Sequence, residues 1–148
     1  MEILNSIVSL IHYNRLYKID YFRKNACEVQ YNTLKHLTNF ATNTEFGKRY
    51  NFASFISYED FSSKVPVHEY DDFKPFIERV MNGEQNIIWP TEIKWFAKSS
   101  GTTSDKSKFI PISRESLEEC HFQSGKDIYA MYAHKRPASK IFVGKTLV

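Results

Sequence analysis

The chain has 148 residues, of which 42% are hydrophobic and 16% aromatic, which is enough apolar material for one folded core and argues against disorder. A formal net charge of +3, spread along the chain, is too mild to indicate nucleic-acid binding. Cys27 and Cys120 have no CxxC partner, so neither a disulfide framework nor a zinc cluster is indicated, and reduced thiols in a cytoplasmic protein fit best.

The N-terminal third is predicted to be helical. Apolar side chains recur at helical spacing from Ile3 to Ile11 and again from Cys27 to Ala41. The first segment is not an export signal, because it follows Glu2 rather than a basic region and lacks a small-residue cleavage site. No run approaches the roughly 18 apolar residues of a membrane-spanning helix, so a soluble protein is expected.

Two shorter helices are predicted in the middle of the chain. Ser57 followed by Asp60 is typical of an N-cap with an acidic first turn. The next helix should end at Asn82–Gly83, which supplies a left-handed residue. Inside it, Pro75 predicts either a kink or a true helix start near Lys74, with the preceding turn as a lead-in.

The second half is predicted to alternate between strands and helix. Residues 93–98 alternate as in a strand, and residues 109–112 suit a second strand. Ser113 then stands where an N-cap would start a long helix that Arg136–Pro137 ends. Residues 145–148 look like an unfinished strand. The predicted fold class is therefore α/β, with a helical N-terminal half followed by strand, loop, strand, helix and strand.

The loop between the two predicted strands concentrates candidate phosphate donors. Its small residues place backbone amides and hydroxyls close together, and its two lysines supply positive charge. The spacing excludes the P-loop of ATPases, because Gly101 lies one residue too close to Lys106 and Asp105 occupies the place of the second glycine. A plain polar turn with solvated lysines remains the alternative interpretation. The candidate residues are Ser99, Ser100, Gly101, Thr102, Thr103, Lys106 and Lys108.

Five segments of the chain match a known family in their expected order. A long run extends from Trp95 to Pro111, and four shorter pieces precede it at residues 44–47, 58–61, 65–67 and 70–75. Together, over about residues 25–135, they resemble the plant auxin-responsive acyl-acid-amido synthetase family and its bacterial relatives. The chain departs from this family at Asp105, where many relatives have Gly, and at Ser107, where many have Pro.

The resemblance implies a member of the firefly-luciferase-like adenylating superfamily, in which a serine/threonine/glycine loop holds the ATP phosphates. ATP and a small carboxylic acid would give an acyl-adenylate and pyrophosphate, and an amine, often an amino acid, would then take the acyl group. Lys106 or Lys108 would neutralise the leaving pyrophosphate together with Mg²⁺, and no side chain is assigned as a metal ligand. The phosphate-binding residues would be Ser99, Ser100, Gly101, Thr102 and Thr103.

Family members are several hundred residues long. The resemblance therefore implies that residues 1–148 are the N-terminal portion of the adenylation domain, truncated, inactive alone and partnered by the remainder of the parent enzyme. The alternative is a non-catalytic module whose helical half offers an apolar face to a protein, the loop being only a turn. Neither interpretation predicts a nucleic-acid or membrane partner.

Overall fold

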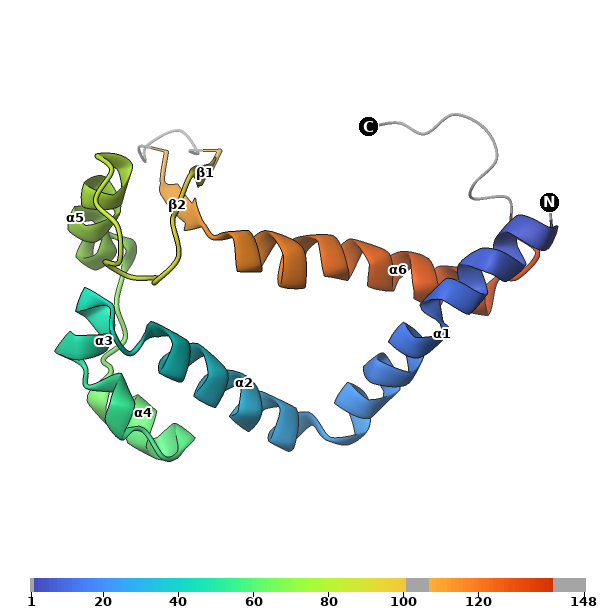
Figure 1. The fold of residues 1–148 in the computed structure, drawn as a ribbon, viewed down its shortest axis with the longest axis horizontal. Coiled ribbons are helices and arrows are strands. Elements are labelled where there is room, and N and C mark those ends of the chain that lie inside the picture. The colour runs from blue at the N-terminus through green and yellow to red at the C-terminus, as the bar shows by residue number, and fades with distance from the viewer. Residues whose placement is uncertain (1, 101–106, 140–148) are drawn as a thin grey trace. The chain divides into compact units, whose positions relative to one another are not determined.

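The computed structural model describes residues 2–100 and 107–139, with side chains from residue 13 onward. The predicted order of elements and the α/β fold class are confirmed (Figure 1). The strand predicted at residues 145–148 lies outside the described residues. The elements are α1 (Glu2–Lys24), α2 (Ala26–Ala41), α3 (Glu45–Arg49), η1 (Phe52–Ser54), α4 (Tyr58–Lys64), α5 (Tyr70–Met81), β1 (Trp95–Lys98), β2 (Phe109–Ile112), the π-helical η2 (Ser116–His121) and α6 (Phe122–Lys135).

The chain divides into two compact units, and the first contains residues 1–26 and 118–148. In this unit α1 packs against α6. Ala130 and Ala133 of α6 are buried, and such small side chains let helices approach closely. The Arg15 guanidinium donates hydrogen bonds to both carboxylate oxygens of Asp127, at 2.5 and 2.8 Å. Because a bidentate pair is directional, it fixes how α1 lies on α6.

The second unit contains residues 27–117 and is built around two hydrophobic clusters. Trp89 packs against both of them. Its indole Nε1–H donates to the Glu115 carboxylate at 3.1 Å, so the polar tip of the ring is satisfied while its apolar body stays in the core. The buried members are Ala41, Phe46 and Phe52 in one cluster and Val80, Ile87 and Ile93 in the other.

Residues 44–47, one of the pieces that carry the family resemblance, start α3. Thr44 is fully buried, and its Oγ1 accepts the Gly47 N–H at 2.9 Å and donates to the Ala41 carbonyl at 2.7 Å. This is the N-cap hydrogen bond of the helix. A Cβ on Gly47 would lie 2.0 Å from the Ala41 carbonyl oxygen, so no residue larger than glycine fits there.

Three predicted helix boundaries are confirmed. The Ser57 hydroxyl accepts the Asp60 N–H at 3.1 Å and caps α4. Gly83 follows α5 with a φ of 94°, in the left-handed region expected for a helix-ending glycine. The Ser113 hydroxyl accepts the Ser116 N–H at 3.0 Å, which starts the last helical stretch where the sequence predicted it.

The late start predicted for α5 near Lys74 is wrong. The helix begins at Tyr70, after the N-cap Glu69, and Pro75 lies inside it. The Asp72 carboxylate accepts the Glu69 N–H at 2.8 Å, as in a capping box. This capping stabilises the first turn, while Pro75 deletes only one backbone donor of the helix.

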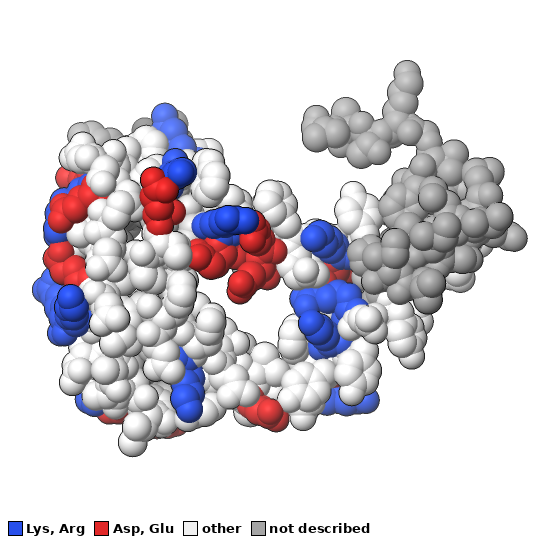
Figure 2. Space-filling view, viewed as in Figure 1, with Lys and Arg blue, Asp and Glu red and all other residues white. Residues whose placement is uncertain are grey.

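Basic and acidic side chains are interleaved on the face shown in Figure 2. Arg79 of α5 contacts Glu45 at 2.7 Å and Glu84 at 2.5 Å. Its hydrogen bonds lower the pKa of both carboxyls.

The described helices include none that is both long and apolar enough to cross a membrane.

We predict that Gly47→Ala will destabilise the protein, because the new methyl group would collide with the Ala41 carbonyl. Overpacking of this kind costs about 1–3 kcal/mol, which urea unfolding followed by circular dichroism measures. Gly125→Ala in α6 is the matched control, since a Cβ there meets nothing within 4 Å and alanine favours a helix. Equal losses in the two variants would contradict the close approach at Gly47.

Candidate functional site

The predicted phosphate-binding loop joins the two strands of an antiparallel hairpin. The last pair in register is Lys98 opposite Phe109. Beyond it, the Ser99 N–H donates to the Lys108 carbonyl and the Lys108 N–H donates to the Ser99 hydroxyl, both at 2.9 Å. The hairpin therefore closes at Ser99 and Lys108.

The first strand is shorter than predicted. It begins at Trp95 rather than Ile93, whose side chain is buried in the core. The Ile93 N–H donates to the Gln85 side-chain oxygen at 2.9 Å, so it is not available to a strand partner. The second strand, Phe109–Ile112, has the predicted bounds, and Pro111 is tolerated because each strand of a two-stranded sheet has a free edge.

The structure brings Ser99 and Lys108 together. Ser99 is half-buried, whereas Ser100 and Lys108 are exposed. The Ser99 N–H is committed to the hairpin, and its hydroxyl accepts a hydrogen bond there, although a hydroxyl can also donate one. The other residues predicted for the site, Gly101, Thr102, Thr103 and Lys106, lie outside the described residues.

Tyr70, the first residue of α5, belongs to the hairpin although sequence reasoning gave it no such part. Its hydroxyl accepts the Phe109 N–H at 2.9 Å and donates to the Phe109 carbonyl at 3.3 Å. Its ring centroid lies 5.4 Å from the Lys108 ammonium. Tyr70 lies in one of the pieces that carry the resemblance, but nothing in the sequence indicated a contact 39 residues away.

Glu115 fixes the segment that leads into β1. Its carboxylate accepts from the Trp89 indole at 3.1 Å and from the Thr91 hydroxyl at 2.9 Å. Burial acts to raise the pKa of Glu115, but hydrogen bonds from its own backbone, Trp89 and Thr91 outweigh that effect and lower the pKa. The chain before the hairpin is thus tied to the helical stretch that follows it.

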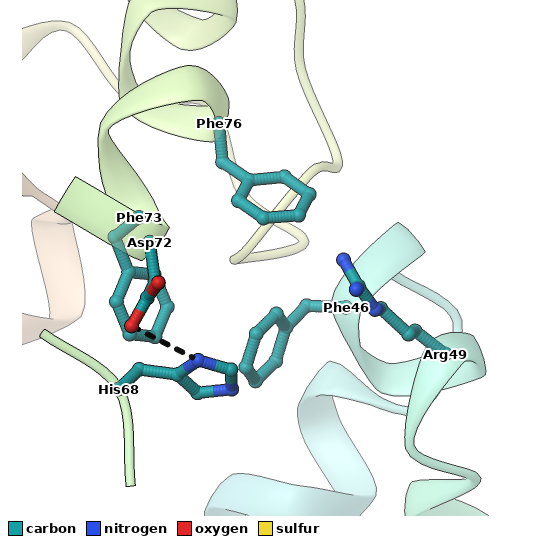
Figure 3. Close-up of a pocket in the computed structure, with 6 residues that line it drawn as sticks. All are labelled: Phe46, Arg49, His68, Asp72, Phe73 and Phe76. Atoms are coloured by element: carbon teal, nitrogen blue, oxygen red, sulfur yellow. Dashed lines mark ion pairs between the residues drawn. The ribbon is translucent and has the colours of Figure 1, made fainter. Parts of the chain in front are cut away.

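A separate pocket of about 140 Å³ lies between α3 and α5 (Figure 3). His68 Nε2 lies 2.9 Å from the Tyr50 hydroxyl, and His68 Nδ1 lies 3.7 Å from the Asp72 carboxylate. His68 therefore has a polar neighbour at each ring nitrogen, and no described residue predicted for the site lines this pocket. Its lining is Phe46, Arg49, His68, Asp72, Phe73 and Phe76.

Metal-ligating residues do not gather anywhere in the described part of the chain. No group of three or more His, Cys, Asp or Glu side chains there is placed to hold an ion. Cys27 and Cys120 are both free and exposed.

Comparison with known proteins assigns the chain to a family. The model of the GH3 family N-terminal domain matches residues 15–148, a range that includes α5 and the whole hairpin. The chain belongs to the GH3 family. This confirms the resemblance inferred from the five matching segments.

Two curated GH3 proteins illustrate the similarity. Indole-3-acetic acid-amido synthetase GH3.3 of Arabidopsis thaliana is 33% identical over 101 residues, which cover 68% of this chain and 17% of that protein. Jasmonoyl-L-amino acid synthetase GH3.5 of Oryza sativa subsp. japonica is 30% identical over 96 residues, covering 64% and 16%. The chain thus spans about a sixth of the length of these GH3 relatives.

A solved GH3 structure has the same fold in this region. The chain of GH3.15 acyl acid amido synthetase matches with a TM-score of 0.71 and 26% sequence identity, over 80% of this chain and 22% of that one. These GH3 homologues are named as acyl-acid amido synthetases, which are amide-forming ligases.

We predict that Ser99→Ala will weaken the end of the hairpin, because the Lys108 N–H loses its acceptor. A lost hydrogen bond of this kind costs about 1 kcal/mol, so amide hydrogen exchange at Lys108 should accelerate roughly fivefold. Ser100→Ala is the control and should leave that exchange rate unchanged. The hydrogen bond would be refuted by equal exchange rates at Lys108 in the two variants.

Proposed function

We propose that this chain supplies the phosphate-binding loop of an ATP-dependent acyl-acid amido synthetase. The observation that carries the proposal is the hairpin closed by Ser99 and Lys108, with a serine/glycine/threonine run between them in the sequence of a GH3 chain. The names of the relatives support a small carboxylic acid as one substrate and an amino acid as the acceptor.

The proposed reaction has two steps. A carboxylate oxygen of the acid attacks the α-phosphorus of ATP, and the bond to the bridging oxygen breaks, so pyrophosphate leaves. The amine then attacks the acyl carbon, AMP leaves, and the amine loses a proton. Negative charge gathers on the phosphate oxygens in the first step, and fixed donors stabilise such charge better than water does.

The hairpin offers suitable donors for those oxygens. A serine hydroxyl such as that of Ser99 can donate as well as accept, and Ser100 and Lys108 are exposed at the closed end of the hairpin. We include Gly101, Thr102, Thr103 and Lys106 in the proposal on the strength of the sequence motif. Mg²⁺ bound with the nucleotide would screen the polyphosphate charge, and its ligands are not assigned.

We further propose that residues 1–148 form the N-terminal portion of the adenylating domain. The chain spans about a sixth of its curated relatives, so adenine, ribose and acyl contacts are expected from other residues of a parent enzyme. The chain alone should then bind ATP weakly and catalyse no ATP–pyrophosphate exchange. The free thiols of Cys27 and Cys120 are exposed, which favours a location in the reducing cytoplasm.

Exposed apolar side chains in the first unit favour a second candidate function, docking to a protein partner. Tyr17 of α1 is 72% exposed and Ile128 of α6 is 64% exposed. Aromatic and aliphatic side chains of this kind are typical of helices that bind another protein. In this reading the hairpin is only a turn, and substitutions in it would leave the function unchanged.

Titration of the 148-residue protein with Mg²⁺–ATP in a calorimeter tests the proposal. The double variant Ser100→Ala/Thr103→Ala removes two hydroxyl donors from the loop and should weaken binding roughly tenfold or more. Ser62→Ala/Ser63→Ala is the matched control in α4, since both hydroxyls donate only to carbonyls of their own helix among the described residues. Absence of ATP binding by the wild-type chain, or equal affinities for the two double variants, would sink the proposal.

A further inference from the structure

Tyr70 joins α5 to the free edge of β2. In the hairpin register, Phe109 directs its backbone N–H and C=O away from β1, as the Tyr70 contacts show. Exposed edge groups of this kind otherwise bond to water or to another strand. One hydroxyl satisfies both of them, so the backbone next to Lys108 is held against the start of a helix.

The ring of the same tyrosine supports the side chain of Lys108. The ammonium lies 5.4 Å from the ring centroid, within the range of a cation–π contact. A lysine side chain is a flexible four-carbon stem with several rotatable bonds. Restricting it before a ligand arrives reduces the entropy lost on binding. The hydroxyl of Tyr70 thus fixes the backbone next to Lys108, and its ring restricts the lysine side chain.

Lys108 is well placed to use this restriction. It is exposed, and its backbone closes the hairpin with Ser99, so the lysine stands at the closed end of the hairpin. A cation that is already oriented stabilises an anion more than one that must reorganise.

We propose that Tyr70 is a positioning residue for polyphosphate binding, which acts by holding Lys108 ready for the phosphates of ATP. The inference rests on the proposed function. Tyr70 belongs to α5, outside the serine/threonine/glycine motif, and it would affect ATP binding only through its contact with Lys108.

A double-mutant cycle on the 148-residue protein tests this role, with Mg²⁺–ATP affinity measured for Tyr70→Leu, Lys108→Met and the double variant. Each single variant should weaken binding roughly threefold to tenfold. The double variant should be about as weak as Lys108→Met alone, because Tyr70 acts through Lys108. Lys108→Met should also reduce the salt dependence of binding, since it removes an ionic contact, whereas Tyr70→Leu keeps the charge of Lys108 and should reduce the salt dependence less.

Two further variants separate positioning from loss of structure. Tyr70→Phe keeps the ring and loses only the hydroxyl, so its affinity should lie between those of the wild type and Tyr70→Leu. Tyr58→Leu is the matched control, since Tyr58 is also the first residue of a helix and is 65% exposed, and it should bind ATP like the wild type.

Three outcomes would count against the role of Tyr70. In the first, the wild type binds ATP and the losses of affinity caused by Tyr70→Leu and Lys108→Met multiply in the double variant. This result would overturn the inference and leave the proposed function standing. Wild-type affinity in Tyr70→Leu would do the same. No binding by the wild type would overturn the proposed function, and the role of Tyr70 with it.

Discussion

The hydroxyl of one tyrosine joins the hairpin of this chain to α5. Tyr70 bonds to both backbone groups of Phe109, and it can do so because it is the first residue of α5. A two-stranded sheet has no interior strand, so its position depends on what its edges contact. The capping of α5 by Glu69 and Asp72 therefore bears directly on where the candidate loop lies.

Segments that look unrelated in the sequence meet around α5. The piece at residues 44–47 caps α3, places Phe46 in the core and sets Glu45 against Arg79 of α5. Trp89 then links the two hydrophobic clusters and bonds to Glu115 beyond the hairpin. The segments that carry the family resemblance thus pack into one unit. The segments outside the loop hold the base of the hairpin in place.

Local signals in the sequence predicted much of this fold, but they could not predict contacts between residues far apart in the chain. Ser57, Ser113 and Gly83 act on backbone groups within three or four residues, so their roles follow from spacing alone. The late start predicted for α5 near Lys74 is wrong because the capping at Glu69 starts the helix at Tyr70, before Pro75. The bond from Tyr70 to Phe109 spans 39 residues, and no pattern of spacing indicates such a contact.

Titration of ¹⁵N-labelled protein with Mg²⁺–ATP, followed by amide chemical shifts, tests most directly whether this hairpin holds phosphate. The largest changes in chemical shift should fall within residues 99–108, and those around His68 in the separate pocket should stay near zero. Changes centred on the pocket between α3 and α5, or no changes at millimolar ATP, would contradict it.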